Sequence, residues 1–261
     1  MSGFSTPAIL LRRIDHGDFD LIATFLTLEK GKISAVAKNA KKSRKRFSGL
    51  LELFSCLEIV CSKGRRGGLA VLREASMNLP FAGIRADVYK TLYAGYWAEL
   101  INGWMEEWKP QPGIYHLLHG SLNDLDTGSV SPAVASIVFQ IRFLILAGYA
   151  PKIDSCTVCG AGLDEIPSGS VIFDLEKGGI VCNGCAAGGD RRKPIRISKG
   201  AVRQLCWMRQ ADAARLSRLR FTETAVREAS EAMERFVPYH LGRMPRSLRV
   251  IWQLRRRGSD G

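Results

Sequence analysis

Two closely spaced cysteine pairs constrain the fold of this chain more than any other feature. The pairs are Cys156-Thr-Val-Cys159 and Cys182-Asn-Gly-Cys185, with the 22 residues 160–181 between them. Two intervening residues let both sulfurs of a pair point at one ion from a tight turn, and two such knuckles at about this separation are typical of a tetrahedral zinc site. Cys156, Cys159, Cys182 and Cys185 are therefore the predicted ligands of one Zn²⁺ per chain.

All four predicted ligands are thiolates, which leaves no coordination position for water and indicates a structural metal. Gly160 follows the first knuckle and Gly184 lies inside the second, where a glycine lets backbone N–H groups turn toward the sulfurs. The insert predicts a small hairpin from residues 171–174 and 179–181. Three alternatives remain open: two redox C-x-x-C motifs, although neither follows a strand in a βαβ unit; an iron–sulfur cluster; or four ordinary cysteines.

Five short segments before residue 75 have the pattern of β-strands. Apolar residues alternate with polar ones, and turn residues separate the runs. The predicted strands cover residues 7–14, 21–28, 32–38, 51–61 and 69–74. Five strands in so short a segment favour a small closed barrel such as the OB-fold. An open five-stranded sheet packed on helices is the alternative.

The rest of the chain outside the cysteine module has helical periodicity. Aromatic and aliphatic residues from 89 to 108 recur at helical spacing, and Pro110 and Pro112 are expected to end that helix. A second helix is predicted over 114–125. Ser131, Ser198 and Thr222 are each predicted to cap a further helix, with an apolar face from Val134 to Ile145 in the first of these. A last short helix is expected over 245–254.

These elements together predict an α+β protein. It combines an N-terminal five-stranded OB-fold barrel, an α-helical domain and an inserted four-cysteine zinc knuckle. The expected boundaries are 1–80 for the barrel, 81–150 for the first helical part, 151–194 for the cysteine module and 195–261 for the second helical part.

The charge balance points to a polyanionic partner. The chain carries 38 Lys and Arg against 25 Asp and Glu, a formal net charge of +13. Nucleic acid is the first candidate for such a chain, and a basic but inert surface is the alternative. The chain has neither a signal-peptide pattern nor a membrane-spanning run, so a cytoplasmic protein without a membrane partner is expected.

Basic residues concentrate in two segments of the predicted barrel. Residues 38–46, which begin at the end of the third strand, hold six cations and no acid, and the tip of the last hairpin adds three more. Loops of this kind on small barrels follow nucleic-acid backbones, and Phe19, Phe47 and Phe54 flank them as potential stacking platforms. A merely solvated charged surface is the alternative. The candidate DNA-binding residues are Lys38, Lys41, Lys42, Arg44, Lys45, Arg46, Lys63, Arg65 and Arg66.

The C-terminal stretch is also basic. No acidic residue occurs from 235 to 259, and Arg243, Arg246 and Arg249 are candidates for contacting DNA or an acidic peptide. The alternative is a solvent-facing helix surface. The four histidines lie in no recognisable nucleophile, metal-hydrolase or phosphate-loop context, so no enzymatic activity is expected.

Three segments make the chain resemble a known family. Residues 8–18 (AILLRRIDHGD), the pair Leu26-Thr27 and residues 31–43 (GKISAVAKNAKKS) are similar to the bacterial DNA repair protein family RecO. The order of barrel, helices, cysteine knuckles and helices is also similar to that of the family. Residues 245–248 (PRSL) resemble it as well. The resemblance covers nearly the whole chain. The family typically has a glycine where Asn39 stands, and not all of its members keep the four cysteines.

The resemblance implies a recombination mediator of the RecF pathway with an N-terminal OB-fold. Such a protein binds single- and double-stranded DNA and anneals complementary strands. It acts with RecR, and in some bacteria RecF, to load RecA onto DNA coated by single-stranded DNA-binding protein (SSB), whose acidic tail some members contact. It would work in DNA repair, including double-strand break repair, at the bacterial nucleoid. Two other functions remain open, a zinc-dependent RNA-binding protein of translation and an adaptor for an acidic partner.

Overall fold

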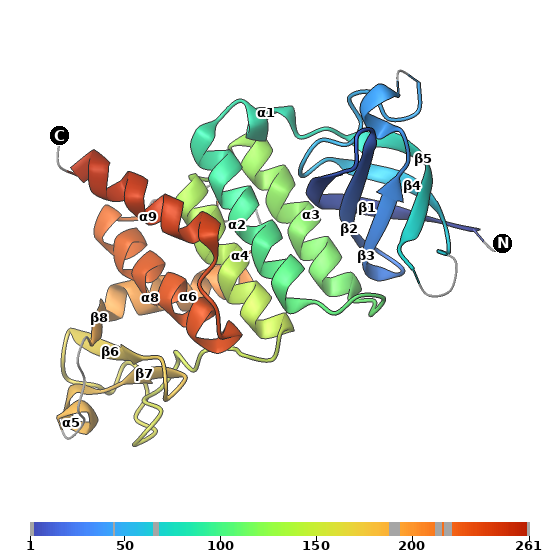
Figure 1. The fold of residues 1–261 in the computed structure, drawn as a ribbon. Helices are drawn as coiled ribbons and strands as arrows, with labels where there is room; N and C mark the ends of the chain where they lie inside the picture. Colours follow the sequence, from blue (N-terminus) through green and yellow to red (C-terminus); the bar gives the residue numbers. More distant parts are fainter. Residues whose placement is uncertain are drawn as a thin grey trace. The chain divides into compact units, whose positions relative to one another are not determined.

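The first five strands close into a barrel in the computed structural model, which describes residues 3–43, 45–64, 68–187, 194–211, 216 and 221–259 (Figure 1). The strands follow the order β1-β2-β3-β5-β4, and β4 returns to pair with β1. β3 runs parallel to β5, and the other neighbours are antiparallel. The predicted OB-fold barrel is confirmed, and the open-sheet alternative is wrong. The strands are β1 Gly3–His16, β2 Asp20–Thr27, β3 Gly31–Ala37, β4 Cys56–Ser62 and β5 Ala70–Leu79.

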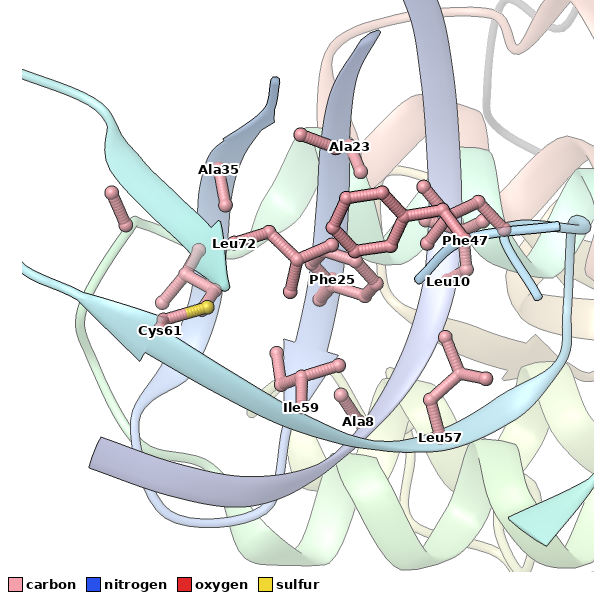
Figure 2. Close-up of a cluster of buried hydrophobic side chains, with 14 of the residues drawn as sticks. Ala8, Leu10, Ala23, Phe25, Ala35, Phe47, Leu57, Ile59, Cys61 and Leu72 are labelled. Carbon is pink, nitrogen blue, oxygen red and sulfur yellow. The ribbon is translucent and has the colours of Figure 1, made fainter. Parts of the chain in front are cut away.

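Alternate side chains of the strands fill the barrel. In β3 every second residue is buried, as the alternation in the sequence predicts. Phe25, Leu57 and Ile59 meet in the interior, and Phe47, from the connection between β3 and β4, joins them (Figure 2). We call residues 38–47, between β3 and β4, the basic loop. Its last residue, Phe47, is part of the barrel core, so the barrel holds this end of the loop in place.

The fourth strand begins later than expected. The sequence pattern predicts a strand from Leu51, but Phe54 has a left-handed φ of 72° and β4 starts at Cys56. The Phe54 and Leu10 backbones still bond, with N···O 2.9 Å, next to the register shift in β1 between Leu10 and Arg12. Residues 51–55 thus form a turn that the irregularity in β1 accommodates.

The barrel belongs to a compact unit that also contains four helices among its described residues. α2 and α9 pack together, and Asp87 caps α2 by accepting a hydrogen bond from Lys90 N at 3.0 Å. Pro112 begins α3 rather than only ending the helix before it, because proline suits a first helical turn. The bounds are α1 Ala82–Arg85, α2 Val88–Trp104, α3 Pro112–Thr127 and α9 Arg246–Ser259.

The segment after α2 covers the open part of the β3 edge. Trp108 was expected to continue the helix but lies outside it, with a φ of 61°. Its N–H donates to the Lys32 carbonyl at 2.9 Å, and Ser34 Oγ bonds Glu107 Oε1 at 2.6 Å. β5 pairs with β3 only at Ala35 and Val36. Residues 106–109, the edge strap, therefore bridge the edge of β3 at Lys32, where β5 does not reach.

Replacing Gly31 by alanine is expected to loosen this strap. A Cβ there would lie 2.2 Å from the Lys109 carbonyl oxygen, and the glycine has a left-handed φ of +73°. The unfolding free energy should fall by at least about 2 kcal/mol, because backbone atoms cannot move aside cheaply. Urea unfolding measures the loss. Gly49→Ala is the control, since Gly49 has a similar φ of +68° but nothing within 4 Å. Equal losses in the two variants would refute the clash.

Among its described residues, the second unit, Gly128–Met244, contains three long helices and a small sheet. Ser131, Ser198 and Thr222 cap α4, α6 and α8, each accepting a backbone N–H of its helix, as predicted. Ile145 was expected on the buried face of α4 but is 40% exposed, because it lies where the helix ends. The bounds are α4 Pro132–Leu146, α5 Asn183–Ala186, α6 Lys199–Gln210 and α8 Glu223–Leu241.

The small sheet has the order β7-β6-β8. β6 Ser170–Asp174 and β7 Gly179–Val181 form the predicted hairpin, whereas β8 Ile195–Ser198 was not expected. β8 pairs antiparallel with β6 and leads directly into α6. The sheet therefore joins the cysteine module to the helices of this unit. None of the helices described is both long and apolar enough to cross a membrane.

Candidate metal centre and nucleic-acid surface

The four predicted cysteine ligands meet at one point in the second unit. All four Sγ atoms lie within 4.8 Å of one another, and Cys159 Sγ is 3.8 Å from Cys182 Sγ. A tetrahedral ion with Zn–S bonds of about 2.3 Å requires sulfur–sulfur distances of about 3.8 Å. None of the four forms a disulfide. The cluster therefore has the dimensions of a single four-coordinate thiolate site.

The two knuckles reach this point by different backbone paths. In the first, Gly160 adopts a φ of +80° and its N–H donates to the Cys156 carbonyl at 3.0 Å, which is the turn that the glycine predicts. In the second, Cys182 follows β7 and precedes α5, and Ala186 N bonds its carbonyl at 3.0 Å. Gly184 lies within α5, so the second turn is a helical one and does not use the conformational freedom of glycine.

The thiols already show the electrostatics of an anionic cluster. Burial of Cys156 opposes ionisation, but N–H groups of Cys159, Cys182 and Val158 outweigh it and lower the Cys156 pKa to about 6. The Cys182 N–H is 3.3 Å from Cys156 Sγ. The Cys185 pKa rises to about 12 through hydrogen bonds to Cys182 and Cys159 and their negative charge. Four thiolates at this separation repel one another, and a bound cation removes that repulsion.

The cysteine module is fastened to the helices of its own unit. Phe173 of β6 packs edge-on against Phe236 of α8, with ring centroids 5.4 Å apart. Ser198 donates through both its N–H and its Oγ to Glu228 Oε2, at 2.9 and 2.7 Å. Asp154 pairs with Arg209 at 3.1 Å, and hydrogen bonding from that guanidinium lowers the Asp154 pKa. Contacts with α6 and α8 thus hold the cysteine module in place.

The basic loop of the first unit is anchored at two apolar points. Ala40 and Phe47 are buried in the barrel core. The described cations of the loop are all exposed residues. The chain is thereby held close to the barrel while its charges face water, as a surface for a polyanion requires. These cations are Lys38, Lys41, Lys42, Lys45 and Arg46; Arg44 lies outside the described residues.

Two of these lysines also contact the turn between β1 and β2. Lys41 Nζ lies 3.1 Å from Asp15 Oδ2 and 3.3 Å from the Gly17 carbonyl. Lys42 Nζ lies 3.4 Å from the centroid of the Phe19 ring. Phe19 is 39% exposed, whereas Phe47 and Phe54 are each 4% exposed. Phe19 is therefore the only one of the three candidate aromatics positioned to stack on a base.

Asn39 occupies a backbone conformation that explains its place in the sequence. Its φ is 56°, in the left-handed region where glycine is usual and asparagine is the most tolerated substitute. Its N–H donates to Asp20 Oδ1 at 2.7 Å. Asn39 thus adopts, at the end of β3, a backbone conformation that glycine also allows.

The second basic segment of the barrel lies away from the first. β3 and β4 run in opposite directions, so the loop after β3 and the hairpin after β4 leave opposite ends of the barrel (Figure 1). Lys63 is exposed at the β4 end, while Arg65 and Arg66 lie outside the described residues. Among the cations that the structure describes, Lys63 is therefore separate from those of the loop after β3.

The candidate arginines near the C-terminus are divided between the two units. Arg243 follows α8 in the second unit, whereas Arg246 and Arg249 lie on α9 in the first. All three are exposed residues. The three candidate arginines thus belong to two units, and only Arg246 and Arg249 share a helix.

Comparison with known proteins matches both parts of the chain to one family. The family models described as Recombination protein O N terminal and Recombination protein O C terminal match residues 1–81 and 85–249. The DNA repair protein RecO of Desulfosudis oleivorans is 44% identical over 260 residues, which cover 98% of this chain and 99% of that protein. RecO of Desulfatibacillum aliphaticivorans is 44% identical over 261 residues, with the same coverage.

A more distant relative agrees with these two. RecO of Anaeromyxobacter sp. (strain K) is 36% identical over 243 residues, covering 93% of each chain. Identity at this level over almost the full length, together with both family matches, confirms the resemblance that the N-terminal segments carry. The chain belongs to the RecO family of DNA repair proteins.

Proposed function

We propose that this protein is a DNA-binding recombination mediator that performs no covalent chemistry. It binds single- and double-stranded DNA and anneals complementary strands. With RecR it helps to load RecA onto single strands coated by SSB. Family membership supports the pathway, and the observation that carries DNA binding is the basic loop. There, exposed cations and the exposed Phe19 share one surface of the barrel.

The proposed mechanism is electrostatic. Two DNA strands repel each other through their phosphates, and cations bound to both lower the free energy of bringing them together. Lys38, Lys42 and Lys45 are placed to contact phosphates without leaving the barrel surface. Phe19 can take a base in place of the Lys42 ammonium, because a cation on a ring occupies the face that a base would use. One strand is then held by its backbone and by at least one base.

The metal has a structural role in this proposal. Cys156, Cys159, Cys182 and Cys185 would hold one Zn²⁺, and the spacing of their sulfurs suits it. The bound ion supplies charge neutralisation and a cross-link between the two knuckles. The chain's own contribution is the N–H bond to Cys156 Sγ and the packing of β6 on α8, which hold the cluster in place.

Strand annealing with the full-length protein tests the proposal. Two complementary DNA oligonucleotides coated with SSB are mixed with the protein, with and without RecR, and duplex formation is followed by fluorescence. We expect the protein to speed annealing, and in a parallel reaction that contains RecA we expect RecA loading onto the coated strand to require RecR. RNA of the same sequence serves as the control. Tighter binding to RNA than to DNA would replace the proposal with an RNA-binding role, and failure to bind either at low salt would refute it.

A further inference from the structure

Helix α9 carries a stripe of four arginines and one glutamine that the proposed function does not use. The stripe follows helical positions i, i+3, i+7, i+10 and i+11, which lie on one face, and consists of Arg246, Arg249, Gln253, Arg256 and Arg257. All five are exposed residues. At 1.5 Å per residue the stripe is about 16 Å long. We call these residues the α9 stripe.

The opposite face of α9 is fixed to α2. Leu248 and Ile251 are buried, and the Arg255 guanidinium lies 5.9 Å from the ring centroid of Tyr93. Glu99 of α2 receives the first turn of α9. Its Oε1 accepts from Arg246 N at 2.9 Å, and its Oε2 accepts from Ser247 N and Oγ at 3.0 and 2.7 Å. The stripe is therefore preorganised, since binding a ligand need not order the helix.

The stripe has no acidic neutralisation of its own. The helix contains no Asp or Glu from Arg246 to Ser259. Within the described part of the chain, no ion pair involves Arg249, Arg256 or Arg257. Closely spaced guanidinium groups on one helix face repel one another, which costs stability. A bound polyanion would offset that repulsion.

The shape of the stripe favours a nucleic-acid backbone over an acidic peptide. Arginine clusters can also recognise acidic peptide motifs, but the α9 stripe is a straight row of side chains and not a compact cluster. A single helix face is convex, and Val250 is the exposed large apolar residue beside the stripe. A DNA backbone needs only a row of cations. At about 3.4 Å of rise per nucleotide in one strand of a duplex, the stripe spans about five nucleotides.

We propose that the α9 stripe is a second DNA-binding site that holds the partner strand while the basic loop of the barrel holds the first. The inference rests on the proposed function, because it assigns one surface to each of the two strands that must meet. Both surfaces lie in the same compact unit, 1–127 with 245–261. The loop supplies a stacking aromatic for a single strand, and the stripe supplies phosphate contacts without base contacts.

The test uses the full-length protein and a variant with Arg249→Gln, Arg256→Gln and Arg257→Gln. A labelled oligonucleotide is first bound to saturation, and a second, non-complementary oligonucleotide with another label is then added. We expect first-strand affinity to change by less than about threefold. Second-strand binding and annealing rate should each fall at least about tenfold at low salt, because three phosphate contacts are lost.

The control variant removes the same charge elsewhere. Lys152→Gln, Lys177→Gln and Arg227→Gln change three exposed residues of the second unit, and this variant should anneal like the wild type. If the stripe variant also takes up the second strand and anneals normally, the stripe is not a DNA site. Loss of binding only to an acidic oligopeptide probe would overturn the inference in favour of a peptide site. If the wild type binds no DNA, the proposed function itself fails.

Discussion

Stripping the metal from the four-cysteine cluster is expected to unfold residues 151–187 while the barrel remains folded. Without the cation, the link between the two knuckles is lost. A structural zinc contributes on the order of 10–16 kcal/mol in isolated finger peptides. The contribution here should be smaller, because Phe173, Ser198 and Asp154 fasten the module to its helices. Hydrogen exchange during chelation measures the order of opening, and β6 and β7 should lose protection first.

Elemental analysis identifies the metal, and two cysteine variants provide the control. Cys182→Ser should release the ion, whereas Cys206→Ser should retain it, because Cys206 lies outside the cluster beside Asp154. Elemental analysis should find one zinc per chain in the wild type. Stoichiometric iron with sulfide would show an iron–sulfur cluster instead. Exchange that opens the barrel before the knuckles would contradict the expected independence of the module.

Neutralising the basic loop should flatten the salt dependence of DNA binding. The change replaces Lys41, Lys42, Arg44, Lys45 and Arg46 with glutamine. Each single-strand phosphate contact contributes about 0.7 to the slope of log affinity against log salt. Lys41 already pairs with Asp15, so about four contacts and a slope change of about 3 are expected. A salt titration of oligonucleotide affinity measures it, and the Lys152, Lys177 and Arg227 control variant should leave the slope intact.

Phe19→Ala separates stacking from charge at the same surface. Removing a stacked aromatic should weaken single-strand affinity by about 1–3 kcal/mol without changing the salt slope, because no charge is lost. Phe19 is 39% exposed, so the substitution should leave the barrel core intact.

An unchanged slope in the five-residue variant would show that the loop does not contact phosphates. An unchanged affinity in Phe19→Ala would remove only the stacking step.

Local patterns were enough to predict most of the fold. The alternation of apolar and polar residues in the first 75 positions predicts the barrel strands. The N-cap residues Ser131, Ser198 and Thr222 each predict the start of a helix. The exceptions are set by distant contacts. Trp108 has helical spacing, yet its backbone bonds to Lys32, more than seventy positions earlier in the chain. β8 is only four residues long and is defined by pairing with β6, so no local pattern distinguishes it.

The metal centre was more predictable than the nucleic-acid surface for a related reason. The spacing of the cysteines within two short turns predicts the ligands, whereas the charge that the basic loop offers to a ligand depends on which residues lie next to it. Nothing in the sequence shows that Asp15 neutralises Lys41 or that Lys42 covers Phe19. The β1–β2 turn that supplies both contacts becomes a neighbour of the loop because β3 pairs with β2, with Ala37 opposite Leu21. Counting cations alone therefore overestimates the charge available for binding.

Closure of the barrel also limits how other proteins can be recruited to it. β5 pairs with β3 at Ala35 and Val36, and the edge strap bridges β3 at Lys32. These contacts leave little of the β3 edge for a partner that would add a strand, because that mode of recognition needs unpaired N–H and C=O groups along a sheet border. A protein that binds the barrel at this edge would instead have to recognise side chains and loops.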